Sequence, residues 1–91
     1  MSYRVEKIKD HWCLLGGLIP DDRVHAGQRW VGSSGATVEI DEVDYKNGWV
    51  DYFWFEADQL KTHSKTIFAF QTRYSLILSE SQLPDWIDNV A

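Results

Sequence analysis

The stretch ATVEIDEVDYKNGWVDYFWF, residues 36–55, decides the fold class of this chain. In its first part, residues 36–43, apolar and acidic residues alternate. Val38 and Ile40 therefore face one side of a strand, and the carboxylates between and beside them face the other. This alternation predicts a strand with one buried face and one solvated face.

The middle of the same stretch carries the signal for a hairpin. Asn47 and Gly48 both tolerate the left-handed backbone that a two-residue type I′ turn requires. The sequence therefore predicts that residues 36–43 pair antiparallel with residues 49–55. A mainly β fold follows from this pairing.

The second strand of the hairpin has large side chains on both of its faces. Asp51 would need a partner on a buried face, so we expect its carboxylate to point to solvent. Val50, Tyr52 and Trp54 then point into the core, because side chains alternate along a strand. The full predicted core consists of Val38, Ile40, Val50, Tyr52, Trp54, Ile67, Leu76 and Leu78.

The opposite face of this strand is predicted to carry Trp49, Phe53 and Phe55 beside Asp51. An uncovered apolar patch of several hundred Å² usually marks an interface in a soluble protein. Two readings stay open. Either the N-terminal segment or a C-terminal helix covers these rings, or the face binds a partner or a second copy of the chain.

Further strands are expected on both sides of the hairpin. Residues 28–32 read as a strand that ends at the turn formed by residues 33–35, where Gly35 is free to take a positive φ. Residues 56–65 are polar and read as a loop. After them, strands are predicted at residues 66–70 and 75–78, joined by a short helical turn.

The flanks are predicted to be helical. In the N-terminal segment, apolar residues recur at spacings of three and four, which is typical of one face of a helix. They are Val5, Ile8, Trp12 and Leu15, followed by Gly16 and Gly17 as a helix end. A strand through residues 12–19 is the alternative. A short helix is expected in residues 80–91, with Pro84 in its first turn.

Four segments, read in chain order, resemble a known fold. They are GQRW (27–30), GATVEI (35–40), GWVDY (48–52) and FQTRYSL (70–76). The arrangement is similar to an SH3-like barrel of the Tudor or KOW kind over residues 27–79, and also to small uncharacterised bacteriophage-encoded proteins.

The resemblance implies a five-stranded antiparallel SH3-like barrel with short helical flanks. Residues 1–91 would form a single domain, with residues 1–26 as an N-terminal extension and residues 80–91 as a short C-terminal helix. Such barrels bind other macromolecules and are rarely enzymes. As in some Tudor domains, Tyr45, Trp49 and Asp51 would form an aromatic cage for a methylated cation.

The composition limits the partners and the compartment. Nine Lys and Arg against 14 Asp and Glu give a net charge of −5, which repels phosphate backbones and makes nucleic acid an unlikely partner. Cys13 is the single cysteine, so no intramolecular disulfide is expected, and a reducing, cytoplasmic location is predicted. No stretch approaches the 18 apolar residues of a membrane span.

Residues with catalytic or metal-binding chemistry are scattered along the sequence. His11, Cys13, His25 and His63 form no second closely spaced pair, so no metal site is expected. No phosphate-binding loop and no activated nucleophile is recognisable, so no cofactor and no catalytic residue is predicted. We therefore expect a protein that is not an enzyme.

The sequence predicts a non-enzymatic protein-interaction module, in the manner of a phage accessory protein that binds a host or phage protein. The predicted binding residues are aromatic and acidic: Tyr45, Trp49, Asp51, Phe53 and Phe55. A homo-oligomer is the other use of this surface. The alternative is a nucleic-acid-related role, either weak binding or mimicry of DNA by aligned carboxylates that inhibits a DNA-binding protein.

Overall fold

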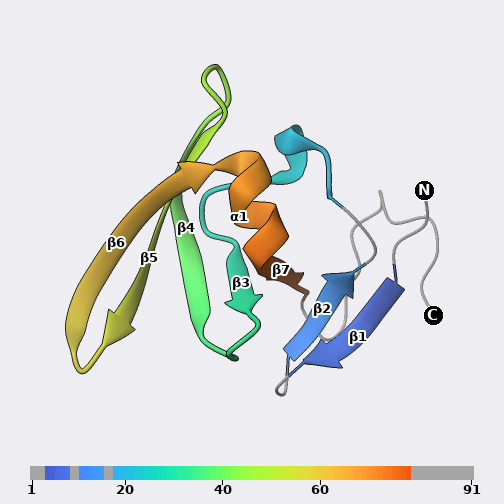
Figure 1. The fold of residues 1–91 in the computed structure, drawn as a ribbon, viewed down its shortest axis with the longest axis vertical. Coiled ribbons are helices and arrows are strands. Elements are labelled where there is room, and N and C mark those ends of the chain that lie inside the picture. Colours follow the sequence, from blue (N-terminus) through green and yellow to red (C-terminus); the bar gives the residue numbers. More distant parts are fainter. Residues whose placement is uncertain (1–3, 9–10, 16–17, 79–91) are drawn as a thin grey trace.

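The predicted hairpin is present in the structure, a computed structural model that describes residues 4–8, 11–15 and 18–78 (Figure 1). Strand β4 (Thr37–Asp44) pairs antiparallel with strand β5 (Trp49–Glu56), with Ile40 opposite Tyr52 and Asp44 opposite Trp49. The predicted pairing of these two segments is therefore confirmed.

The turn of this hairpin differs from the prediction. Four residues, 45–48, connect the strands, and among them only Gly48 has a positive φ, of 73°. The backbone N–H of Gly48 donates to the carbonyl oxygen of Asp44 at 2.8 Å. The Asp44 carboxylate also accepts hydrogen bonds from the backbone N–H and the side-chain amide of Asn47, at 3.2 and 2.9 Å. The type I′ prediction was wrong because these bonds stabilise a longer loop.

A β-bulge in β4 changes which side chains face outward. The pairing register shifts by one residue between Ile40 and Glu42, which places Asp41 as the extra residue. Asp41 and Glu42 are both exposed, and Val43 packs against the core. Strict alternation would have placed Val43 on the outer face with Asp41. The bulge therefore adds one carboxylate to the outer face.

The strands of the described residues form one antiparallel sheet of seven strands, in the order β1-β2-β7-β3-β4-β5-β6. The remaining elements are β1 (Arg4–Ile8), β2 (His11–Leu15), the 3₁₀ helix η1 (Asp21–Arg23), β3 (Arg29–Gly32), β6 (Gln59–Thr66), α1 (Ile67–Arg73) and β7 (Tyr74–Ile77). Strands β1 and β6 are the two edges, so the sheet is open. The prediction of a five-stranded barrel was wrong in both strand number and closure.

The N-terminal segment is a hairpin of β1 and β2, and the predicted helix was wrong. The spacing of its apolar residues fits a helix, but β2 finds an antiparallel partner in β7, with Leu14 opposite Leu76. Tertiary pairing outweighs a local pattern of this kind. The strand alternative at residues 12–19 was closer to the structure. The predicted helix at residues 80–91 lies outside the described residues.

Residues 56–73 also depart from the prediction. The expected loop at residues 56–65 is mostly strand β6, which pairs with β5 along its whole length. The expected strand at residues 66–70 is mostly helix α1, which the hydroxyl of Thr66 caps by accepting the N–H of Ala69 at 3.1 Å. Ile67 and Phe70 are buried one turn apart on this helix.

A two-residue turn with positive φ does occur, but between β5 and β6. Ala57 and Asp58 have φ of 51° and 63°, and Glu56 pairs with Gln59. Both central residues of a type I′ turn require positive φ, which alanine adopts at a cost. The turn was missed because its residues are not the usual Asn and Gly.

Replacing this turn by the favoured pair should stabilise the protein. We expect Ala57→Asn with Asp58→Gly to raise the free energy of unfolding by about 1 kcal/mol, because both new residues tolerate positive φ better. Urea denaturation measures the difference. The control is Ala26→Asn, at an exposed residue that is not among those with positive φ. No gain over wild type would contradict the assigned turn.

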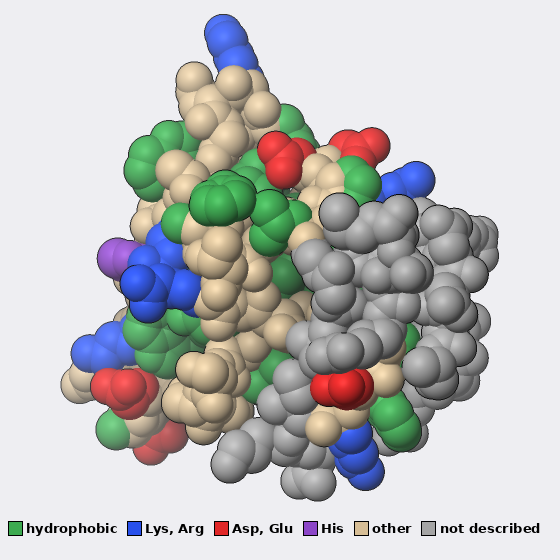
Figure 2. All heavy atoms as spheres, turned by 45° about the vertical axis from the view of Figure 1, so that its right-hand side comes forward, with side chains coloured by type: hydrophobic (Ala, Val, Ile, Leu, Met, Phe, Trp, Pro, Cys, Tyr) green, Lys and Arg blue, Asp and Glu red, His purple; other side chains and the backbone are tan. Residues whose placement is uncertain are grey.

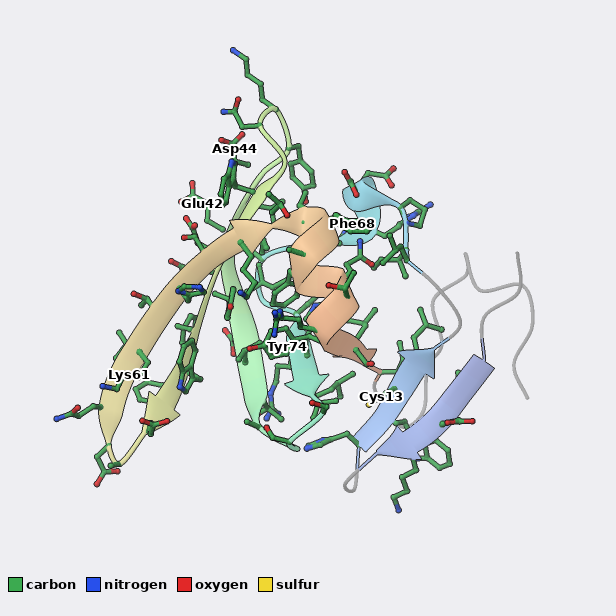
Figure 3. All side chains as sticks on the ribbon, in the orientation of Figure 1. Cys13, Glu42, Asp44, Lys61, Phe68 and Tyr74 are labelled. Carbon is green, nitrogen blue, oxygen red and sulfur yellow. The ribbon has the colours of Figure 1, made fainter. Side chains whose placement is uncertain are left out.

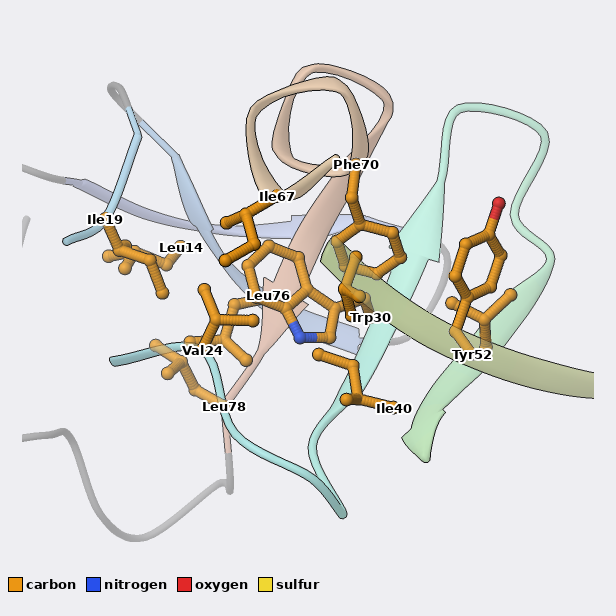
Figure 4. Close-up of a cluster of buried hydrophobic side chains, with 12 residues drawn as sticks. Leu14, Ile19, Val24, Trp30, Ile40, Tyr52, Ile67, Phe70, Leu76 and Leu78 are labelled. Atoms are coloured by element: carbon orange, nitrogen blue, oxygen red, sulfur yellow. The ribbon is translucent and has the colours of Figure 1, made fainter. Parts of the chain in front are cut away.

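The core lies between the sheet and helix α1 (Figure 4). Phe70 is fully buried in this core. The centroid of its ring lies 5.0 Å from that of Trp30, 4.9 Å from that of Tyr52 and 4.8 Å from that of Tyr74. Every predicted core residue is buried except Trp54, which is partly buried against the cluster. The core residues that were not predicted include Leu14, Ile19, Val24, Trp30 and Phe70.

Burial of Tyr52 gives the fold a predicted sensitivity to alkali. Loss of hydration raises the pKa of this phenol above its ordinary value of 10.0, and Tyr74 beside it raises the pKa further. Above pH 10 the unfolded chain releases the phenolic proton while the folded chain keeps it, so stability falls as pH rises. The expected slope is about 1.4 kcal/mol per pH unit.

The Tyr52→Phe variant isolates this effect, because it has no phenolic proton to lose. Urea denaturation at pH 9 and pH 11 should show a larger loss of stability for wild type than for Tyr52→Phe. Equal losses in the two proteins would show that Tyr52 ionises in the folded state as readily as in the unfolded state.

Candidate interaction surface

One face of β5 carries four of the five predicted binding residues: Trp49, Asp51, Phe53 and Phe55, here called the β5 outer face. Trp49 is 46% exposed and Phe55 is 70% exposed, and the other two are half-buried. Val50 and Tyr52, between them in sequence, are buried on the opposite side. The predicted orientation of Asp51 toward the outer face is therefore confirmed.

Strand β4 supplies a row of carboxylates beside the aromatic rings. Glu39 is opposite Phe53, and Asp44 is opposite Trp49. Glu42 is opposite Asp51, so two carboxylates meet on neighbouring strands. Figure 3 shows Glu42 and Asp44 together toward the β4–β5 turn. The outer face is thus negatively charged along one side of its aromatic row.

Strand β6 supplies neutral side chains on the other side of the row. Leu60 is opposite Phe55, and Thr62 and Ser64 are opposite Phe53 and Asp51. The Ser64 hydroxyl donates a hydrogen bond to the Asp51 carboxylate, which fixes that carboxylate between the strands. With the rings of Phe53 and Phe55 edge to face at 6.3 Å, the outer face is an ordered aromatic strip.

Asp44 is held in its charged form by the loop that follows it. Hydrogen bonds from the side-chain amide and then the backbone N–H of Asn47 lower the pKa of the Asp44 carboxyl below its ordinary value. The same two bonds order the loop that carries Tyr45. The negative charge at this end of the outer face therefore persists into mildly acidic solution.

The fifth predicted residue, Tyr45, lies at a surface hollow beside this end of the face. Its lining includes three carboxylates and two rings, from Glu42, Asp44, Tyr45, Trp49 and Asp51, with a single lysine, Lys46. The three members of the proposed aromatic cage are thus brought to one hollow. An excess of carboxylates beside aromatic rings favours a cationic side chain there.

Tyr45 is also tied to a distant part of the chain. Its hydroxyl donates to the carbonyl oxygen of Val24 at 2.5 Å and lies 3.2 Å from Nδ1 of His25. This bond joins the β4–β5 loop to the segment between η1 and β3. The hydroxyl is therefore already used within the fold, and Tyr45 offers mainly its ring to a ligand.

Three surface residues of this region were missed by sequence reasoning. Glu42 reaches the outer face only because of the bulge, and Leu60 because the expected loop is a strand. Arg29, opposite Glu39 on β3, lines a second hollow with Phe53 and Phe55. Its place could have been found from the register of β3 against β4.

No described element covers the β5 outer face. Helix α1 packs on the opposite side, where Phe70 meets Tyr52, and the β1–β2 hairpin joins the sheet beyond β7. The N-terminal strands, residues 4–8 and 11–15, therefore do not cover these rings, which removes one part of the first reading, coverage by the N-terminal segment or a C-terminal helix. Coverage by a C-terminal helix falls outside the described residues.

The described residues were also searched for a reactive cysteine, a metal site and a membrane-spanning helix. Cys13 is buried, with its thiol 3.4 Å from the carbonyl oxygen of His11. No three side chains of His, Cys, Asp or Glu among the described residues come together as metal ligands. Within the same residues, no helix has the length and apolar character needed to cross a membrane.

Comparison with known proteins gave no match to a family model, a curated protein or a solved structure.

Proposed function

We propose that this protein is a non-enzymatic interaction module that binds a partner protein through the β5 outer face. The observation that carries the proposal is the exposure of Trp49 and Phe55 on the same strand face as Asp51. Large exposed rings gathered on an ordered strand are costly in water, and interface centres are enriched in aromatic residues.

The carboxylates around the rings specify the chemistry of the partner. Glu39, Glu42 and Asp44 border the aromatic row. Together with Asp51 they outnumber the two basic neighbours, Arg29 and Lys46. We expect a partner surface with apolar side chains at its centre and Lys or Arg at its rim. Such charges steer encounter and select partners, while the rings supply most of the binding energy.

Quantitative affinity capture tests the proposal. Wild type, Phe55→Ala and the matched control Phe68→Ala are immobilised, and proteins retained from a lysate of the source cell are quantified by mass spectrometry. Phe68 is 65% exposed on α1, away from the β5 outer face, and it matches Phe55 in residue type and exposure.

The expected result is a protein that wild type and Phe68→Ala retain equally and Phe55→Ala loses. Equal retention by all three baits would contradict the proposal. Capture of a nucleic-acid-binding enzyme, lost when Glu39 and Glu42 are replaced by Gln but kept in Phe55→Ala, would instead favour mimicry of DNA.

A further inference from the structure

The β6 edge is a second surface with its own chemistry. Strand β6 ends the sheet, is eight residues long and pairs with β5 at every position without a bulge. It contains no Pro and no Gly, the residues that commonly interrupt edge strands. The edge is therefore regular enough to accept another strand.

The register shows which backbone groups of β6 have no partner strand among the described residues. Glu56 and Gln59 close a two-residue turn, so they form a hydrogen-bonded pair, and such pairs alternate along antiparallel strands. At the other end of β6, the N–H of Ile67 donates to the carbonyl oxygen of Gly48 at 2.9 Å. This bond confirms that the odd-numbered residues of β6 direct their backbone groups toward β5. The groups that point away from β5 belong to Leu60, Thr62, Ser64 and Thr66.

The two faces of β6 differ in charge. Lys61, His63 and Lys65 share the inner face, opposite Trp54, Tyr52 and Val50 of β5. The outer face carries Leu60 and three hydroxyl side chains, and β6 has no carboxylate. Figure 2 shows basic and histidine side chains gathered on the side of the molecule where Figure 1 places β6. The edge is thus a basic strip on an acidic protein.

These charges oppose pairing of β6 with a second copy of itself. Residues opposite each other in an antiparallel pair lie on the same face, so an odd-numbered residue of one copy meets an odd-numbered residue of the other. Any such register that overlaps five or more residues sets a lysine against a lysine or against His63. Lysines opposite each other destabilise a strand pair, and a lysine opposite His63 gains no ion pair, because β6 has no carboxylate.

We propose that the β6 edge binds an extended, acidic segment of another protein as an added antiparallel strand. Carboxylates at alternate positions of that segment lie opposite Lys61, His63 and Lys65. Its intervening residues, with small or β-branched side chains, form hydrogen-bonded pairs with Leu60, Thr62, Ser64 and Thr66. Backbone bonds supply the affinity and the alternating charges supply the selectivity. This inference does not depend on the function proposed for the β5 outer face.

The test uses fluorescently labelled nine-residue peptides in which glutamate alternates with threonine or valine, and matching peptides with lysine in place of glutamate. Fluorescence anisotropy at low salt should give at least roughly tenfold tighter binding of the glutamate peptide, since each cross-strand charge pair changes sign between the two. For Lys61→Glu with Lys65→Glu the preference should invert. The control with the same change in net charge, Lys7→Glu with Lys46→Glu, should bind as wild type does.

Methylation of peptide nitrogens separates strand addition from simple attraction between charges. Methyl groups on the threonine and valine nitrogens, which face β6 in the proposed pairing, should weaken binding at least roughly tenfold. Methyl groups on the glutamate nitrogens, which face solvent, should leave it unchanged. Equal effects of the two methylated peptides, or no effect of the lysine reversals, would overturn the proposal.

Two further measurements complete the design. Trp49→Ala should bind the peptides as wild type does, so that failure of this proposal and failure of the proposed function are distinguishable. Sedimentation velocity tests whether a second copy of the chain binds the β6 edge instead. A dimer in which the amides of β6 become protected from hydrogen exchange would contradict the proposal that the edge binds an acidic segment of another protein.

Discussion

Phe70→Ala is expected to lower the free energy of unfolding by about 3 to 5 kcal/mol, the usual cost of emptying a large aromatic site in a core. Phe70 is fully buried and contacts the rings of Trp30, Tyr52 and Tyr74, so its removal leaves a cavity that these large neighbours cannot readily fill. The substitution also removes ring contacts that hold helix α1 against the sheet. Urea denaturation at neutral pH measures the loss.

The matched control is on the same helix. Phe68 is two residues away and 65% exposed, so Phe68→Ala is expected to change stability by no more than about 0.5 kcal/mol. If Phe70→Ala does not fold, Phe70→Leu gives a smaller loss that can be measured. Similar values for Phe68→Ala and Phe70→Ala would contradict the assignment of α1 and of its buried side.

Trp49→Ala is expected to weaken association with the captured partner at least roughly thirtyfold, because truncating an aromatic anchor costs about 2 kcal/mol or more and each 1.4 kcal/mol is a factor of ten. The melting temperature should stay close to that of wild type, since the ring is 46% exposed and no described element covers it. Calorimetric titration and a thermal melt of the same samples measure both quantities.

Comparison with Phe53→Ala sharpens this expectation. Phe53 is half-buried and packs edge to face on Phe55, so its removal should lower both the affinity and the melting temperature. A large fall in the melting temperature of Trp49→Ala, with unchanged affinity for the partner, would contradict the proposed interface. It would show that the β5 outer face is a covered part of the core.

The β4–β5 hairpin was predictable because its signal is local. Val38 and Ile40 alternate with carboxylates, and Asp51 could not be buried, so one strand face was assigned to the core and the other to solvent. Four of the five proposed binding residues followed from that single assignment. The prediction was less accurate for Trp54. This side chain lies on the inner face, but it is so near the end of β5 that the core covers it only in part.

The elements that the sequence did not predict depend on pairing with strands that are distant in the sequence or on register across the sheet. Strand β6 is polar because an edge strand needs no apolar residues on its solvated side, so its composition resembles that of a loop. The β1–β2 hairpin exists because β7, more than 50 residues away in sequence, pairs with β2. The bulge that turns Glu42 outward depends likewise on register across the sheet, which alternation within one strand does not encode.

The central claim is that a partner buries the β5 outer face, and hydroxyl-radical footprinting measures this on the unmodified protein. Oxidation rates of exposed aromatic side chains are compared between the free protein and its complex with the captured partner. Trp49 and Phe55 are expected to become protected in the complex, while Phe68, which is 65% exposed on α1, is oxidised at its free rate. Unchanged oxidation of Trp49 and Phe55 in a complex that protects Phe68 would contradict it.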